Sequence, residues 1–72
     1  MNIKVETHSG YKADEYPRKF WIGEMQLEIM DIEDRWFSPE FSYFKVFADD
    51  GKTYILRQNL ESGQWEIVKE LA

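Results

Sequence analysis

The sequence predicts an all-β domain, a small antiparallel meander of five to six strands. Apolar and polar residues alternate in several short segments, as they do in strands that bury one face. Turn-forming Gly, Asp, Asn and Pro residues separate these segments. With 72 residues, the chain is expected to form a single domain over residues 1–72.

The first half of the chain predicts two strands around a long loop. The first strand is expected over 2–7, where apolar and charged residues alternate from Ile3 onward. Residues 8–17 have neither a helical nor a strand period and end in a proline, so we expect an ordered loop, the longest of the chain. A second strand is expected over 18–22, and it ends at Gly23.

Residues 24–36 show the clearest alternation, with Glu and Gln on one face and apolar residues on the other. The pattern slips after Ile29, and one extra residue near 30–31 would return Ile32 to the core, as a β-bulge does. The bulge is expected to bend the strand so that 34–36 begins a corner. A helix over the same residues is the rival interpretation, because the large apolar residues also recur at helical spacing.

The second half of the chain predicts three more strands joined by turns. These strands are expected over 42–48, 53–58 and 65–69. A loop over 37–41 precedes them, because Pro39 is barred from the middle of a sheet. In the turn 49–52, Gly51 supplies the left-handed residue that a type I turn with a bulge requires. A second turn is expected over 59–63.

Closure of the meander into a barrel would remove the exposed edges of the sheet. We therefore expect an SH3-like or related small barrel. Aromatic residues make up 17% of the chain, and because each buries roughly 150–250 Å², most of them are expected to be structural. The predicted core consists of Val5, Phe20, Leu27, Ile29, Phe44, Val46, Leu56 and Ile67.

Charge and cysteine content exclude several classes of function. The chain has 9 Lys and Arg against 14 Asp and Glu, a net charge of -5, which opposes non-specific binding to phosphate backbones. It contains no Cys, so disulfides, thiolate metal sites and cysteine nucleophiles are excluded. The single histidine, His8, excludes sites with several histidine ligands.

We expect no enzymatic activity, no cofactor and no metal. His8 precedes Ser9, but adjacent side chains on a strand point to opposite faces and do not form a nucleophile–base pair. The acidic residues of 31–34 lack the glycine of a calcium-binding loop, and those of 49–51 suit an ordinary hairpin turn. No apolar run reaches the roughly 18 residues of a membrane span, and no signal peptide precedes the domain, so a cytoplasmic protein without membrane contact is expected.

Seven short motifs occur once each along the chain, in a recognisable order. They are Gly10-Tyr11, Pro17-Arg18-x-Phe20, Asp34-Arg35-Trp36, Tyr43-Phe44-Lys45-Val46, Asp50-Gly51, Tyr54-x-Leu56-Arg57 and Trp65. In this order the chain resembles a family of short bacterial proteins that are usually described only as hypothetical or cytoplasmic proteins. The resemblance covers nearly the whole chain and implies a stand-alone domain in the bacterial cytosol, with no assigned activity and no catalytic residues.

Arginine and aromatic residues supply the one candidate interaction surface. Each of the three arginines lies within three residues of an aromatic side chain. We predict a recognition patch of Tyr11, Trp21, Arg35 and Trp36, because Trp, Tyr and Arg dominate binding hot spots. The structural alternative is that the arginines only hold the fold, through ion pairs with Asp34 and by covering tryptophan rings.

Two classes of function remain open at this point. The first is a small, monomeric, non-catalytic module that binds a protein or peptide partner, as small barrels commonly do through aromatic grooves. The alternative is a small barrel that binds single-stranded nucleic acid by stacking bases on aromatic rings. The acidic charge disfavours the alternative, because stacking sites normally lie in a positively charged groove.

Overall fold

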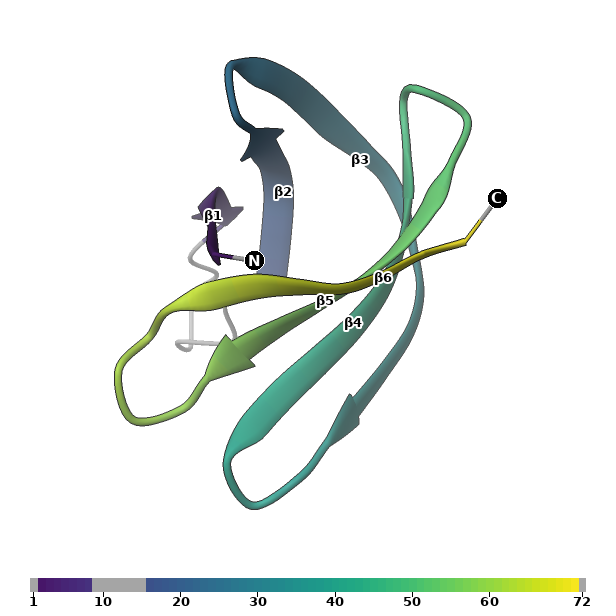
Figure 1. Ribbon diagram of the computed structural model, residues 1–72. Helices are drawn as coiled ribbons and strands as arrows, with labels where there is room; N and C mark the ends of the chain where they lie inside the picture. Colours follow the sequence, from purple (N-terminus) through teal and green to yellow (C-terminus); the bar gives the residue numbers. More distant parts are fainter. Residues whose placement is uncertain (1, 9–15, 72) are drawn as a thin grey trace.

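The computed structural model describes residues 2–8 and 16–71, and these residues form six β-strands and no helix. The strands are β1 (Asn2–His8), β2 (Tyr16–Ile22), β3 (Met25–Phe37), β4 (Phe41–Ala48), β5 (Thr53–Asn59) and β6 (Trp65–Leu71) (Figure 1). The predicted all-β class is therefore confirmed, and the helical interpretation of 24–36 is wrong. The described part of the chain holds no helix long and apolar enough to cross a membrane.

Each strand pairs antiparallel with the next, and β1 pairs with β6 to close a barrel. This confirms the predicted small barrel, and its six-stranded antiparallel form is compatible with an SH3-like architecture. The closing seam is short, because its register contains only Asn2 opposite Glu66 and Ile3 opposite Trp65. Figure 1 shows β6 starting on the side of β1 and crossing the front of the barrel toward the C-terminus.

The long strand β3 belongs to both halves of the barrel. Its pairing with β2 runs as far as Glu28, and from Ile29 it pairs with β4. The register shifts between Ile29 and Asp31, which confirms the predicted bulge, and Ile32 packs against the core. A second shift follows between Ile32 and 34, and two bulges in one strand bend it sharply.

The predicted corner at 34–36 and the predicted strand start at 18 are both corrected. Residues 34–36 stay in β3, because they continue to pair with β4. Strand β2 begins at Tyr16 and includes the buried Pro17, which lies opposite Thr7 just past a register shift in β1. A bulge is one of the few places where a sheet accepts a proline. Residues 9–15 of the predicted loop lie outside the described residues.

The predicted hairpin between β4 and β5 is confirmed. Gly51 has φ +82°, and its N–H donates to the carbonyl of Ala48 at 3.0 Å. The N–H of Ala48 donates to the carbonyl of Lys52 at 2.9 Å, and the Asp50 carboxylate accepts the Lys52 N–H at 3.0 Å. This is the type I turn with a left-handed residue that the sequence predicts.

One apolar core fills the barrel. The buried hydrophobic residues are Phe20, Leu27, Phe44, Val46, Ala48, Tyr54, Leu56 and Trp65. Among the predicted core residues, Val5, Ile29 and Ile67 are only partly buried, and they pack against this core. Ala48, Tyr54 and Trp65 were not predicted, although Tyr54 alternates with Leu56 on the same face of β5.

Candidate functional site

A row of four side chains crosses the outer face of the barrel from β3 to β6. It consists of Trp36, Tyr43, Arg57 and Glu66, each directly opposite the next in the strand register. The neighbouring Phe44 and Leu56 point inward to the core, and alternation along a strand therefore directs these four outward. We call these four residues the outer row.

Direct contacts hold the outer row in place. The rings of Trp36 and Tyr43 stack with their centroids 5.4 Å apart and their planes 4° apart. The Arg57 Cζ lies 4.1 Å from the centroid of the Phe41 ring, and its Nε donates to Glu66 Oε1 at 2.9 Å. The Glu66 carboxylate, followed by the Tyr43 hydroxyl, raises the pKa of the Arg57 guanidinium above its ordinary value.

Trp36 is the end member of the outer row and is 37% exposed. One face of its ring lies against Tyr43. On the other side of β3, the pairing with β2 stops at Glu28, so within 2–8 and 16–71 no strand pairs with this part of β3. The second face of the Trp36 ring therefore borders an open sheet edge.

The hydrogen-bond pattern identifies which main-chain groups lie on that edge. The N–H of Ala48 donates to Lys52 and the N–H of Leu60 donates to Glu40, both at 2.9 Å. Glu40, which directly precedes β4, and Ala48, its last residue, thus bond toward β5, and so do the even-numbered residues between them. Because antiparallel strands bond to each neighbour with alternate residues, the odd-numbered residues of β4, including Tyr43, bond toward β3.

Trp36 lies opposite Tyr43, and its main-chain groups are therefore used by β4. The main-chain N–H and C=O groups of Arg35 and Phe37 point the other way, toward the open edge. The carboxylate of Asp34 covers this edge in part, because its Oδ1 accepts the Arg35 N–H at 2.8 Å. We call residues 34–37 of β3 the edge segment.

The inner side of the edge segment carries a second aromatic cluster. The Arg35 Cζ lies 5.0 Å from the ring centroids of both Phe37 and Phe44. Phe44 is buried, whereas Phe37 is 63% exposed. Arg35 therefore stacks at the margin of the core, and the apolar ring of Phe37 extends from that margin into solvent.

Two hollows lie near these surfaces. A groove of about 360 Å³ separates 16–18 of β2 from 29–32 of β3, on the same side of β3 as the open edge. A pocket of about 500 Å³ lies between two turns and is lined by Pro39, Glu40, Asn59, Leu60 and Glu61. The lining of the pocket includes two carboxylates but no nucleophile with a neighbouring base.

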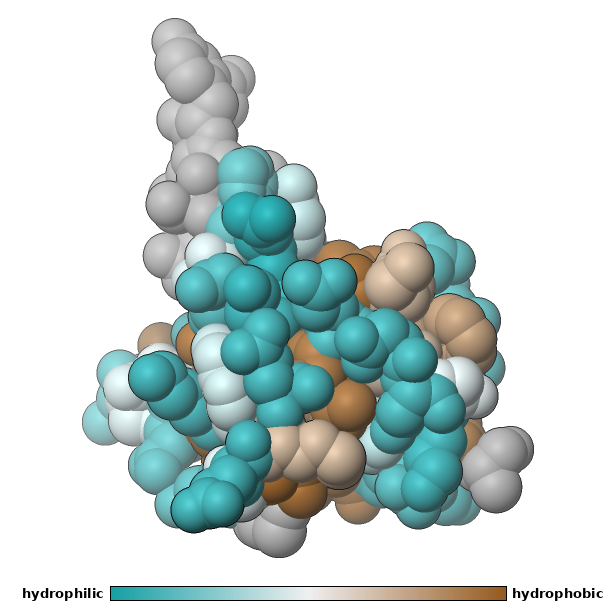
Figure 2. Space-filling view, turned by 90° about the horizontal axis from the view of Figure 1, so that it is seen from above, coloured by the Kyte–Doolittle hydropathy of each residue, from teal (hydrophilic) through white to brown (hydrophobic). Residues whose placement is uncertain are grey.

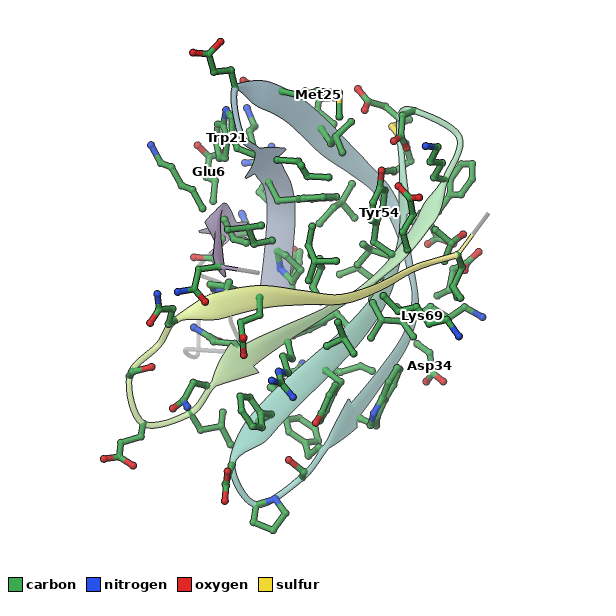
Figure 3. The ribbon with its side chains drawn as sticks, viewed as in Figure 1. Glu6, Trp21, Met25, Asp34, Tyr54 and Lys69 are labelled. Atoms are coloured by element: carbon green, nitrogen blue, oxygen red, sulfur yellow. The ribbon has the colours of Figure 1, made fainter. Side chains whose placement is uncertain are left out.

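The structure places the residues of the predicted patch on separate surfaces. Tyr11 lies outside the described residues. Trp21 is on β2, half-buried, with the Lys4 Nζ 5.1 Å from its ring centroid, and Figure 3 shows it on a different side of the barrel from Asp34. Arg35 and Trp36 are neighbours in β3 and therefore point to opposite faces.

The arginines do not contact the partners that the structural alternative expects. Asp34 accepts a main-chain N–H rather than a guanidinium, and Arg57 pairs with Glu66 instead. The place over the Trp21 ring is taken by Lys4 and not by Arg18. The residues that sequence reasoning missed are Phe37, Phe41, Tyr43 and Arg57. Alternation with Phe44 could have placed Tyr43 on the outer face.

His8 packs its ring against Tyr16 at a centroid distance of 5.2 Å. Across the described ranges, no three His, Cys, Asp or Glu side chains lie close enough together to hold a metal ion.

Figure 2 shows the end of the barrel that carries the β2–β3 and β4–β5 turns, where apolar residues appear between hydrophilic ones. This end lies away from the edge segment.

The comparisons with known proteins supply no functional assignment for this surface. No protein-family model, no curated protein and no solved structure matches the chain.

Proposed function

We propose that the protein is a small, monomeric, non-catalytic module that binds a protein or peptide partner through the outer row and the edge segment. One observation carries the proposal: Trp36 is held flat against Tyr43 while its other face borders an unpaired strand edge. Large aromatic side chains at such positions contribute much of the binding energy in protein interfaces.

The rigidity of the outer row supports this function. Association normally costs side-chain entropy, roughly 0.5–1.5 kcal/mol for each side chain that becomes immobilised. Stacking holds Trp36 and Tyr43 together, and the ion pair with Glu66 holds Arg57, before any partner arrives. These side chains therefore lose most of their conformational entropy when the protein folds, and they would lose little more when a partner binds.

The same surface is less suited to the alternative, a binder of single-stranded nucleic acid. Arg57 is already paired with Glu66, and Asp34 adds a further negative charge beside Trp36. The outer row therefore offers phosphates no net positive charge, whereas base-stacking sites normally lie in a positive groove. A protein partner has no such requirement. We place this activity in the bacterial cytosol, as the family resemblance implies.

A peptide selection tests the proposal. A random peptide library displayed on phage is panned against the wild-type protein, and recovered peptides are measured against Trp36→Ala and Phe47→Ala. Phe47 is the matched control, because it is also 37% exposed and lies on the outer face of β4, away from the edge segment.

We expect the selected peptides to lose roughly tenfold or more in affinity for Trp36→Ala, about 1.4 kcal/mol, and to bind Phe47→Ala normally. Melting curves of both variants report whether the fold is intact. Peptides that bind Trp36→Ala as tightly as the wild type would show that the outer row is not the binding surface. Trp36-dependent binding of single-stranded oligonucleotides, without any selected peptide, would favour the alternative.

A further inference from the structure

We infer that the partner adds to β3 as an extra strand in which basic residues alternate with apolar ones. This inference rests on the proposed function and specifies the chemistry of the partner. It follows from three features of the edge segment: its free main-chain groups, the open face of Trp36 and the carboxylate of Asp34.

The main-chain groups of the edge segment match those of a strand that lacks a neighbour. The C=O of Arg35 and both main-chain groups of Phe37 point away from β4, as derived above from the alternation of bonds. An extended peptide can pair with such groups, which is the basis of recognition by β-strand addition. The groove between 16–18 and 29–32 adjoins the same edge and leaves room for the peptide to continue.

The alternation also predicts which side chains would touch. With Arg35 and Phe37 bonded to an added antiparallel strand, the peptide residue opposite Trp36 would occupy a non-hydrogen-bonded pair. Side chains approach most closely in such pairs, at about 4.5 Å between Cα atoms. That residue would therefore lie on the free face of the Trp36 ring and extend the outer row by one member.

Charge complementarity selects a basic residue for the outward positions of the peptide. A guanidinium or ammonium group over a tryptophan ring is the most favourable cation–π arrangement. Two residues along the same face, Asp34 offers a carboxylate directed away from the barrel interior (Figure 3). Lys45 lies opposite Asp34 in β4, but the ion pairs in the described part of the chain use Glu6, Glu66 and Glu70. The Asp34 carboxylate instead accepts the Arg35 N–H.

Asp34 would then act as a charge-selective cover for the edge. In the free protein its carboxylate accepts a hydrogen bond from the Arg35 N–H. A basic side chain opposite Asp34 would attract that carboxylate and release the N–H to the peptide backbone, whereas a neutral or acidic side chain would not. Edge strands are commonly protected by charged residues in this way.

The inner positions of the peptide favour apolar residues. Successive residues of a strand point to opposite faces, so the peptide residues between the basic ones would lie beside Arg35 and Phe37. Phe37 is 63% exposed, and an apolar neighbour would remove part of its ring from water. The expected partner is thus a strand with basic residues on one face and apolar residues on the other.

A second copy of the chain does not fit this edge. A two-fold pair of β3 strands centred on Trp36 would place Trp36 opposite Trp36 and Asp34 opposite Ser38 of the other copy, so neither position receives a basic side chain. The two copies would also repel each other, because each carries a net charge of -5.

The test uses defined synthetic peptides and isothermal titration calorimetry. The first peptide alternates arginine with valine; the second replaces each arginine by glutamine; the third has the composition of the first with the arginines grouped together. A fourth is the first peptide with alternate backbone nitrogens methylated. The protein variants are Asp34→Asn and Asp34→Ala, with Glu24→Gln as the control that removes one exposed charge at the distant β2–β3 turn.

We expect the alternating arginine peptide to bind the wild type at least about tenfold more tightly than each of the other three. Asp34→Asn keeps an acceptor for the Arg35 N–H but loses the charge, so the preference for arginine over glutamine should fall. Asp34→Ala frees the N–H and should improve binding of the glutamine peptide. Glu24→Gln should change none of these ratios. Slowed amide exchange at Phe37 in the complex would report strand addition directly.

Other outcomes overturn the inference without overturning the proposed function. Equal binding of the glutamine peptide would remove the charge argument, and equal binding of the grouped or methylated peptides would remove strand addition. A concentration-dependent dimer in sedimentation, abolished by Trp36→Ala, would make the second copy the occupant. If none of the four peptides binds while the phage selection yields Trp36-dependent peptides of another pattern, the function stands and the strand inference fails.

Discussion

Tyr54 buries its ring in the core while its hydroxyl donates to a carboxylate of the β4–β5 turn. Its side chain is only 1% exposed, and its hydroxyl donates to Asp50 Oδ2 at 2.5 Å. Burial, and then the hydrogen bond and charge of Asp50, raise the pKa of Tyr54 well above its ordinary value of 10.0. Burial alone would raise the pKa of Asp50, but bonds from Tyr54 and the Lys52 N–H lower it overall.

These two shifts predict a pH window for the bond. Because the pKa of Tyr54 is raised in the folded state, its stabilisation is complete below pH 10 and falls as the pH rises further, where the unfolded chain loses the proton first. Because the pKa of Asp50 is lowered from 3.8, its contribution is present above that pH and is lost as the pH falls through the folded value.

Tyr54→Phe should therefore lower the free energy of unfolding by about 1–2 kcal/mol at neutral pH, since hydrogen bonds to charged groups are the stronger ones. The difference from the wild type should shrink above pH 10. Urea unfolding at pH 7 and pH 11 measures both values, with Tyr16→Phe as a control at a ring that is 39% exposed. A difference that does not change with pH would mean that the bond to Asp50 does not stabilise the fold.

At the scale of the element, a substitution in the β4–β5 turn measures the energetic cost of backbone strain without a contribution from steric contacts. Gly51 has φ +82°, and a Cβ built there would meet no heavy atom within 4 Å. Gly51→Val should therefore cost roughly 1 kcal/mol or more through left-handed backbone strain alone. Gly51→Asn should cost less, because Asn tolerates this conformation. Equal losses for Val and Asn in urea unfolding would contradict a strain mechanism.

The course of β3 shows what the sequence could and could not predict. The first bulge was predictable, because strict alternation would have placed the apolar Ile32 in water. The second bulge lies among polar residues, Glu33 and Asp34. Without it Trp36 would face inward and with it Phe37 does, so the pattern of apolar residues does not select between the two registers. The strands and turns could therefore be predicted from the alternation of apolar and polar residues and from the turn residues, whereas the position at which β3 ends could not.

The candidate site was harder to predict than the fold because it depends on register. Alternation within one strand can direct Trp36 or Tyr43 outward. Their contact requires the cross-strand register, which the two bulges of β3 and the length of the 38–40 turn determine together. The adjacency of Arg35 and Trp36 in the sequence was misleading for a different reason, because neighbours in a strand do not share a face.

At the scale of the whole molecule, the barrel has one weak seam. β1 pairs with β6 only through Asn2 opposite Glu66 and Ile3 opposite Trp65, whereas β4 and β5 pair along their full length. The Trp65 ring is buried against Phe44, with 5.5 Å between ring centroids, and so belongs to the main core. Ile3 is half-buried, so β1 contributes less to the core at this seam than β6 does.

We therefore predict that β1 separates from β6 before the rest of the barrel unfolds. In native-state hydrogen exchange, the amides that bond across the β1–β6 seam should exchange through a local opening that is nearly independent of urea, whereas those of β4 and β5 should require global unfolding. Ile3→Ala deletes apolar contact on the β1 side of the seam and should speed exchange in β1 more than it lowers the global free energy of unfolding. Val68→Ala, at a β6 residue that is 47% exposed, serves as the control. If β1 and β5 exchange with the same free energy and the same urea dependence, the barrel opens as one cooperative unit and the seam is not its weak point.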